Sequence, residues 1–338
     1  MNFIILERMT YQKIIISRTD SIGDVILTLP LAGYLKKCFP QTKIVFFGKS
    51  YTKAVVAACK FVDEFLNYDE FQDLNREDQT SFLKQVNADV IVHVFPRKDI
   101  AHSARKAQIP IRIGTSHRFY HWTTCNKTVN FSRKKSELHE AQLNFKLLTP
   151  LDIKADLSIE EIVPFFSLSS SISLPQEIHS LLDINKTKVI LHPKSQGSAV
   201  EWGVAHFASL ASLLIDKGFQ VIVTGTAKEK EMIAHSALFQ VKGIVDLTGK
   251  LSLEELMTLI NTCDALVAAS TGPLHIASAM NKKAIGLYSE RRPIHPGRWK
   301  PIGANASYLS KSREGASDKE LDDLIKQITP EEVLQKIV

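Results

Sequence analysis

The chain has 338 residues, enough for two domains of ordinary size. Apolar residues make up 44% and charged residues 23% of it, which excludes a disordered chain, a collagen-like repeat and a small disulfide-held scaffold. The 42 Lys and Arg against 36 Asp and Glu give a formal net charge of +6, which favours an anionic partner. Phosphates, acidic sugars, a membrane surface and nucleic acid all meet that condition.

Cysteine usage and hydropathy favour a cytoplasmic protein. The cysteines are scattered and form no C-x-x-C pair, so we expect neither a disulfide framework nor a zinc site: Cys38, Cys59, Cys125 and Cys263. The apolar stretch at the start is too short for a signal peptide, and Met9 is an alternative start of translation. The longest nearly apolar run, residues 25–35, is far below the length of a membrane span.

Short β-branched runs alternate with helical patterns in the first half, which is typical of parallel βαβ units. We expect buried strands at residues 13–17, 43–47, 89–94 and 111–113. Segments such as residues 51–59 and 78–86 read as helices between them. Residues 150–185, rich in proline and containing the serine run 167–173, are expected to connect two domains and to act as a hinge.

The second half repeats this architecture. We expect strands at residues 188–192, 220–224, 244–246, 265–268 and 284–287. Residues 204–216 carry an apolar stripe at helical spacing, and capping boxes at Ser252–Glu255 and Thr329–Glu332 open two further helices. The fold class is therefore α/β, with two doubly wound Rossmann-like domains that face each other across a cleft. We expect the domains to span residues 1–163 and 164–315, with residues 316–338 as a terminal helix packing back on the N-terminal domain.

The first strand-to-helix junction ends on a carboxylate, Asp24. It lacks the G-x-G-x-x-G of a dinucleotide fold, since Gly23 is its one glycine, and it has no P-loop lysine. Asp24 therefore reads either as a helix-start residue that satisfies free amides or as a general base.

The junction after residues 265–268 offers a phosphate site. Residues 269–275, ASTGPLH, place hydroxyls, a glycine and a proline where a helix begins, so free amides and the positive end of the helix dipole face a ligand. The alternative is a well-capped helix with His275 packed inward, and the sequence leaves both open.

Two further junctions in the second half carry candidate ligand groups. Lys194 and Ser195 follow residues 188–192, where an ammonium and a hydroxyl would meet a diphosphate, although a solvated lysine is the simpler interpretation. Glu229 follows residues 220–224 at the third position of a helix, so a capping box is its first interpretation and ligand binding its second.

The basic charge is concentrated between Arg97 and Lys135. This stretch holds ten Lys or Arg against one acid, Asp99, with aromatic residues interleaved. Such asymmetry favours an anionic partner at the N-terminal domain. RNA suits this composition, but no RNA-binding signature accompanies it, and a phosphorylated or acidic carbohydrate fits equally well.

Taken in order, these junctions resemble glycosyltransferase family 9, which includes the lipopolysaccharide heptosyltransferases. The resemblance covers nearly the whole chain and rests on an ordered set of short pieces: residues 17–24 with Pro30, residues 112–114, His192-Pro193 with Trp202, residues 247–249 and 251–255, residues 270–277, and Arg298-Trp299.

The resemblance implies a GT-B architecture and inverting transfer from a nucleotide-activated sugar, usually ADP-heptose, without a metal or another cofactor. It makes Asp24 the base and assigns the donor to Lys194, Ser195, Glu229, Ser270, Thr271, Gly272, Pro273 and His275. For the acceptor, an anionic lipid-linked saccharide, we expect Arg18, Ser21, Gly23, Arg97, Lys98 and Arg118. A monomer in peripheral contact with the inner membrane face, without nucleic acid, is the expected form.

Departures from the family pattern concern the donor. Val200 and Gly203 stand where a lysine and a proline are common, and Ser270 replaces a frequent aspartate. Lys194 is our hypothesis for the missing cation. Two alternatives remain at this point: a non-catalytic protein that binds RNA or another anion through the basic region, and a nucleotide-sugar epimerase of GT-B shape.

Overall fold

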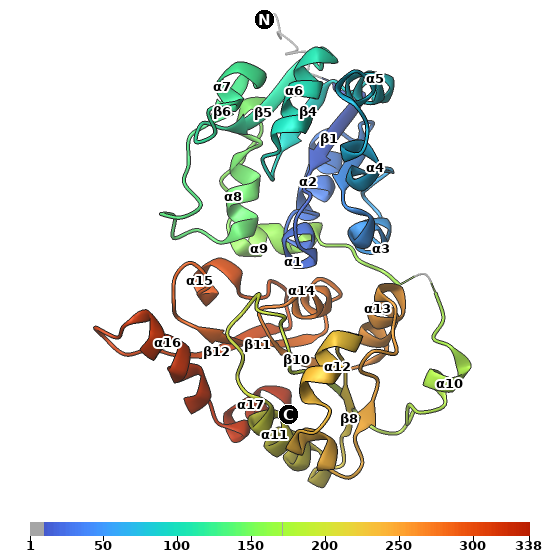
Figure 1. Cartoon of the computed structure of the whole chain (residues 1–338), viewed down its shortest axis with the longest axis vertical. Coiled ribbons are helices and arrows are strands. Elements are labelled where there is room, and N and C mark those ends of the chain that lie inside the picture. Colours follow the sequence, from blue (N-terminus) through green and yellow to red (C-terminus); the bar gives the residue numbers. More distant parts are fainter. Residues whose placement is uncertain (1–9, 171) are drawn as a thin grey trace, which may run out of the picture.

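The computed structural model describes residues 10–170 and 172–338, so the alternative start at Met9 lies outside the described residues. Two domains are stacked along the long axis of the molecule, each built on a six-stranded sheet covered by helices (Figure 1). Every strand pair within the two sheets is parallel. This confirms the α/β class, because helical crossovers keep successive strands parallel.

The N-terminal sheet has the strand order β3-β2-β1-β4-β5-β6. Its strands are β1 (Lys13–Ser17), β2 (Lys43–Gly48), β3 (Glu64–Asn67), β4 (Val90–His93), β5 (Ile111–Thr115) and β6 (Lys127–Val129). Its helices are α1 (Ile22–Ile26), α2 (Pro30–Cys38), α3 (Lys53–Ala57), α4 (Tyr68–Gln72), α5 (Arg76–Val86), α6 (Lys98–Lys106), α7 (His121–Thr124), α8 (Glu140–Lys146) and α9 (Ile159–Ile162).

The C-terminal sheet has the strand order β12-β11-β10-β7-β8-β9. Its strands are β7 (Lys188–His192), β8 (Gln220–Val223), β9 (Val245–Asp246), β10 (Ala265–Ala269), β11 (Lys283–Ser289) and β12 (Ala306–Lys311). The helices of this half are α10 (Gln176–His179), α11 (Val204–Asp216), α12 (Ala227–Ile233), α13 (Leu253–Thr262), α14 (Gly272–Ala279), α15 (Pro296–Trp299), α16 (Asp318–Leu324) and α17 (Pro330–Ile337).

Every predicted strand is present, with ends that shift by at most two residues. Three strands were not predicted, β3, β6 and β12, and all three lie at sheet edges. Edge strands are half-buried or exposed, so their sequences lack the continuous apolar run of a central strand. Both predicted capping boxes are confirmed, at the starts of α13 and α17.

The chain leaves the N-terminal domain later than residue 163. Phe165 packs on Tyr34 with 5.2 Å between ring centroids, and the Ser169 amide donates to the Ala58 carbonyl over 3.1 Å. The next residue, Ser170, already contacts Thr258 of α13 through its hydroxyl. The chain therefore passes from one domain to the other between Ser169 and Ser170. The hinge over residues 150–185 stays a prediction.

The terminal residues pack on the C-terminal domain, which corrects our expectation for residues 316–338. Helix α17 buries Val333, Leu334 and Ile337 and packs against α11. The Trp202 indole also donates to the Ile328 carbonyl over 2.9 Å. The expectation was wrong because the apolar stripe of α17 continues the core of its own domain.

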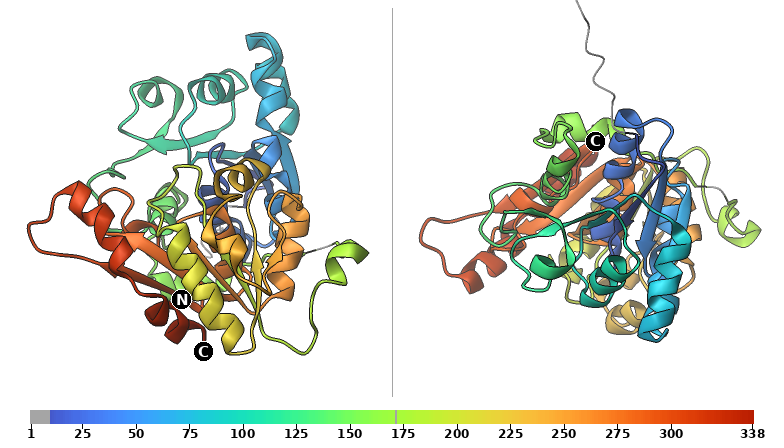
Figure 2. Two further views of the ribbon diagram at one scale, coloured as in Figure 1. Left: turned by 60° about the horizontal axis from the view of Figure 1, so that its bottom comes forward. Right: turned by 90° about the horizontal axis from the view of Figure 1, so that it is seen from above.

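The two domains touch through the starts of α1 and α14. A Cβ atom added to Gly23 would lie 3.0 Å from the His275 ring, and one added to Gly272 would lie 3.0 Å from the Ile22 side chain. Glycines at both helix starts thus allow the domains to approach closely. A second contact joins the His139 ring to the Lys300 carbonyl over 2.9 Å. Figure 2 shows the two domains from two further directions.

Candidate functional site

A cavity of about 690 Å³ lies between the domains, at the carboxyl ends of the central strands. Such ends are where parallel α/β sheets bind ligands. The N-terminal domain contributes the turn into α1 and Tyr51. The C-terminal domain contributes the residues that follow β7, β8 and β10, together with Leu251–Leu253 and the α15 region, including Arg298 and Trp299.

The cavity brings together most of the predicted site residues. All predicted donor positions line it: Lys194, Ser195, Glu229, Ser270, Thr271, Gly272, Pro273 and His275. From the opposite domain it receives Ser21, Gly23 and Asp24, and Arg18 lies directly behind Asp24. Arg97 reaches this region through a 3.0 Å hydrogen bond from its Nε to the Thr19 hydroxyl. Lys98 and Arg118 do not line this cavity.

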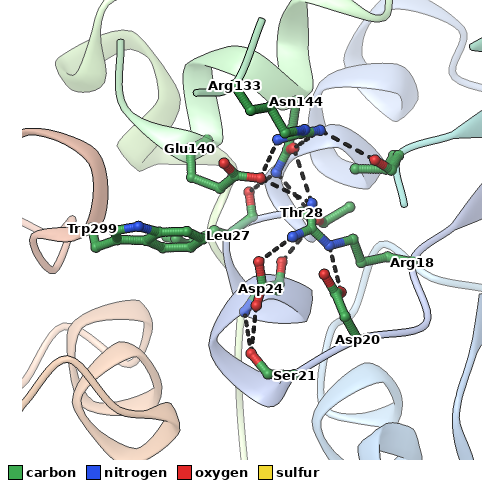
Figure 3. Close-up of polar contacts among 12 residues, drawn as sticks. Arg18, Asp20, Ser21, Asp24, Leu27, Thr28, Arg133, Glu140, Asn144 and Trp299 are labelled. Carbon is green, nitrogen blue, oxygen red and sulfur yellow. Dashed lines mark hydrogen bonds and ion pairs between the residues drawn. The ribbon is translucent and has the colours of Figure 1, made fainter. Parts of the chain in front are cut away.

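Asp24 is held by side chains. Its carboxylate accepts hydrogen bonds from the Ser21 hydroxyl and from Nη2 of Arg18, while the Ser21 side chain caps α1 (Figure 3). Within the described residues its carboxylate accepts no backbone amide, which argues against the helix-capping interpretation. The side chain is 17% exposed, so it faces the cavity while its orientation is fixed.

Asp20 shares the same arginine. Nε of Arg18 donates to the Asp20 carboxylate over 2.6 Å. Burial raises the pKa of Asp20 to about 6, and the negative charge of Asp24 adds to the rise, although Arg18 opposes it. Sequence reasoning missed this second carboxyl group, because nothing in the sequence around Asp20 indicates that its side chain is buried.

Glu140 links both domains at the edge of the site. This fully buried carboxylate accepts from Nη1 of Arg18 over 3.1 Å and from Arg133 (Figure 3). It also accepts from Nη2 of Arg298 over 3.0 Å. Arg298 belongs to the C-terminal domain. Burial opposes the charge of Glu140, but the three arginines outweigh burial and hold its pKa below the usual range.

The turn from β10 into α14 faces the cavity with unpaired groups. Thr271 is the N-cap residue of α14, yet its buried hydroxyl has no hydrogen-bond partner in the described residues. Nδ1 of His275 is likewise buried without a partner. Burial lowers the pKa of His275 to about 4, against the opposing effect of Asp24, so the imidazole is neutral at neutral pH.

Lys194 is paired with Glu201, a residue that sequence reasoning missed. The ammonium donates to one oxygen of Glu201, and the Ser195 amide donates to the other over 2.9 Å. The Ser195 hydroxyl lies 3.0 Å from that same second oxygen. Lys194 is therefore positioned at the cavity with its charge already compensated.

Glu229 occupies the capping box that the sequence predicted. Its carboxylate accepts from the Thr226 amide over 2.7 Å, and its own amide donates to the Thr226 hydroxyl over 3.2 Å. The same side chain lines the cavity and comes within 4.0 Å of His192. Glu229 therefore caps α12 and lines the cavity at the same time, so the two interpretations of this residue are compatible.

Comparison with known proteins gives the family. A family model described as glycosyltransferase family 9 (heptosyltransferase) matches residues 81–328. The chain belongs to this family.

Relatives and solved structures agree with that membership of family 9. The lipooligosaccharide heptosyltransferase 2 of Haemophilus influenzae is 24% identical, over 96% of this chain and 98% of its own. The solved structure of a family 9 glycosyl transferase from Veillonella parvula has a TM-score of 0.79 at 21% identity, covering 97% of this chain and 96% of that chain. The ADP-heptose lps heptosyltransferase II of E. coli has a TM-score of 0.74 at 20% identity, covering 96% and 97%. The two structures confirm the predicted GT-B fold.

This family 9 protein has a second cavity, of about 680 Å³, in its N-terminal domain between α5 and α6. Five basic side chains line it together with one acid, Asp99: Arg76, Arg97, Lys98, His102 and Lys106. The Arg97 guanidinium stacks 4.7 Å from the Tyr68 ring centroid, and its Nη atoms make no hydrogen bond to any described residue. None of the four Lys and Arg forms an ion pair within the described part of the chain.

Arg118 of this family 9 protein lies elsewhere, exposed in the turn between β5 and α7. Residues 10–170 and 172–338 contain no group of three or more His, Cys, Asp or Glu side chains placed to share a metal ion. Within the same ranges, no helix is both long enough and apolar enough to cross a bilayer.

Proposed function

We propose that this family 9 protein is an inverting, metal-independent heptosyltransferase. It would transfer heptose from ADP-heptose to the anionic core of a lipid-linked lipopolysaccharide acceptor. Family membership supports the transferase class, and the relatives' names supply the sugar and the acceptor class. One observation carries the proposal most strongly: a single cavity holds Asp24 from one domain and the α14 turn from the other.

Asp24 is suited to act as the general base. Arg18 and Ser21 each donate to one oxygen of its carboxylate, so the side chain is held at the cavity without a search through rotamers. The carboxylate takes the proton of an acceptor hydroxyl as that oxygen attacks the anomeric carbon of the donor. The bond from the anomeric carbon to the diphosphate breaks on the opposite side, which inverts the centre and releases ADP.

The C-terminal domain would stabilise the charge that grows on the leaving diphosphate. The start of α14 offers backbone amides and the positive end of its dipole, and Thr271 offers a hydroxyl without another partner. His275 would contribute a neutral hydrogen bond, since burial lowers its pKa to about 4. Lys194 contributes positive charge that is reduced by its pairing with Glu201.

The second cavity gives the acceptor an anion site on the same domain as the base. Arg97 bridges the two regions, because its Nε binds Thr19 near Asp24 while its ring-stacked guanidinium lines the second cavity. Its Nη atoms, which bond to none of the described residues, suit a phosphate or carboxylate of the acceptor together with Lys98 and Lys106.

A nucleotide panel tests this function. Calorimetry with ADP, UDP, GDP and CDP and their sugars should single out ADP-heptose, and a product assay should then show heptose on the acceptor and not without it. Added EDTA should leave the rate unchanged. Turnover of the donor without acceptor would identify an epimerase, and a flat panel with salt-dependent RNA binding would identify the anion-binding alternative.

A further inference from the structure

Residues 116–124, which comprise the turn after β5 and the short helix α7, expose two large aromatic side chains side by side. Phe119 is 81% and Trp122 65% exposed, and their rings meet edge to face with centroids 5.1 Å apart. We call these residues the aromatic turn. Exposing two adjacent aromatic rings to water is unfavourable, so a contiguous pair of this kind marks a contact surface.

The aromatic turn is rigid, because side chains bind it internally. The Trp122 indole donates to the Ser116 carbonyl over 2.7 Å, and the Thr124 hydroxyl donates to the Tyr120 carbonyl over 2.6 Å. Within the same segment the His121 side chain is fully buried, and its Nδ1 lies 2.9 Å from the Thr115 carbonyl oxygen. The Trp122 ring is thus held by its hydrogen bond, and the Phe119 ring packs against it.

The chain on both sides of the aromatic turn is basic. Residues 100–136 contain eight Lys or Arg and no Asp or Glu. Arg112 and Arg133 are used internally, by backbone carbonyls and by Glu140. Four others are exposed on the turn or on its neighbours: Arg118 in the turn, Lys127 in β6, and Arg105 and Lys106 in α6, which contacts α7. Lys134 and Lys135 are also exposed, but they lie between Arg133 and Glu137, at the boundary with the C-terminal domain.

We propose that the aromatic turn docks this protein on an anionic bilayer, with Phe119 and Trp122 in the headgroup region and the exposed cations over acidic lipids. Tryptophan at the interface and surrounding Lys and Arg are the features that bind such a surface. Figure 1 shows α7 at the part of the N-terminal domain remote from the C-terminal domain, so docking there leaves the donor domain clear of the bilayer. Helix α7 packs on α6, which carries part of the second cavity.

This inference deepens the proposed function, whose acceptor is lipid-linked, by assigning the surface that meets the lipid. Its test measures binding to lipid vesicles in the absence of donor and acceptor. Trp122 is the exposed one of the three tryptophans, since Trp202 is fully buried and Trp299 lies in the interdomain cavity. Vesicles of phosphatidylglycerol with brominated acyl chains should therefore quench and blue-shift Trp122 fluorescence at low salt, and phosphatidylcholine vesicles should not.

Variants separate insertion from simple attraction. Phe119→Ser with Trp122→Ser should weaken sedimentation with phosphatidylglycerol vesicles by about tenfold or more, because two interfacial aromatic rings are lost. Trp122→Phe should remove the quenching but keep the binding. Ile184→Ser, at a residue 89% exposed in the C-terminal half, is the matched control and should bind vesicles like the parent protein.

Three results would overturn the inference. The first is that the protein does not associate with phosphatidylglycerol vesicles. The second is that it associates with them but Trp122 fluorescence is not quenched. The third is that the protein binds itself or RNA instead of lipid, and that the double variant abolishes this binding. ADP-heptose transfer to a water-soluble acceptor, measured without lipid, reports on the proposed function separately, so either can fail alone.

Discussion

The molecule holds its cations in two contrasting ways. At the cleft, Arg18, Arg133 and Arg298 converge on the buried Glu140, and every charge has a partner. Around the second cavity, Arg97 and Lys98 line open space without an acid partner among the described residues. Paired charges fix a geometry, whereas unpaired cations retain hydrogen-bonding capacity for a ligand. The difference indicates a rigid network of ion pairs beside Asp24 and, in the second cavity, cations that remain available to a ligand.

Replacing Asp24 tests the paired region at its catalytic end. Asp24→Asn should lower turnover by about 10²- to 10⁴-fold, the usual contribution of a general base, while calorimetry shows nearly unchanged ADP binding. Asp20→Asn is the matched control, since it removes the other carboxyl on Arg18 and should retain far more activity. Near-normal turnover in Asp24→Asn would remove Asp24 from the role of base.

Removing the central acid tests whether the pairing is structural. Glu140→Gln should lower the free energy of unfolding by about 3–5 kcal/mol, because it removes the fully buried carboxylate that pairs with Arg18, Arg133 and Arg298. Glu137→Gln, which breaks the exposed interdomain pair with Arg292, should leave the urea midpoint unchanged. Equal effects of the two variants would contradict the contrast between the regions.

The histidines extend the contrast to pH. Burial lowers the pKa of His139 to about 3 and of His275 to about 4, so the unfolded chain binds protons below pH 6.5 that the folded protein excludes. Stability should therefore fall with falling pH, by roughly 2 kcal/mol or slightly more per pH unit near pH 5 from these two residues. Asp20, whose pKa is raised to about 6, opposes this change with a smaller contribution.

Urea unfolding between pH 7 and pH 4.5 measures that slope. His275→Gln should remove the share of one of the buried histidines whose pKa burial lowers, so the slope should become shallower. His102→Gln, in the exposed second cavity, should change the slope much less. A slope that His275→Gln leaves intact would show that the buried imidazole does not titrate as described.

Neutralising the second cavity tests its unpaired cations. Arg97→Gln with Lys98→Gln should raise KM for the acceptor by about tenfold, the effect of one charge-assisted hydrogen bond, with donor affinity unchanged. Lys84→Gln, an exposed residue on α5 outside the cavity lining, serves as the control. A loss of donor affinity instead would move these cations to the donor site.

The smallest expected effect concerns Lys194. Because Glu201 already compensates its charge, Lys194→Ala should weaken ADP affinity by only about threefold to tenfold. Calorimetry beside Lys217→Ala, an exposed lysine after α11, measures the difference. Unchanged affinity would contradict our hypothesis that Lys194 supplies the cation that the departure at Val200 removes.

The sequence predicts the central strands and the junction residues well, for a physical reason. A buried strand such as residues 188–192 needs continuous apolar character, and ligand groups follow its carboxyl end. Edge strands β3, β6 and β12 face water and lack that signal. Glu140 and Glu201 were missed because an ion pair leaves no periodic pattern, and Arg18 and Glu140 are 122 residues apart.

The sharing of Glu140 has a consequence for the turnover cycle. If the predicted hinge opens the cleft for product release, that opening would pull Arg298 away from Glu140. Arg18 and Arg133 stay on the N-terminal side, so the carboxylate would keep two of its partners throughout the opening motion. The Arg298–Glu140 pair could therefore break in such an opening without leaving Glu140 as an unpaired buried charge, so this contact would add little to the cost of opening.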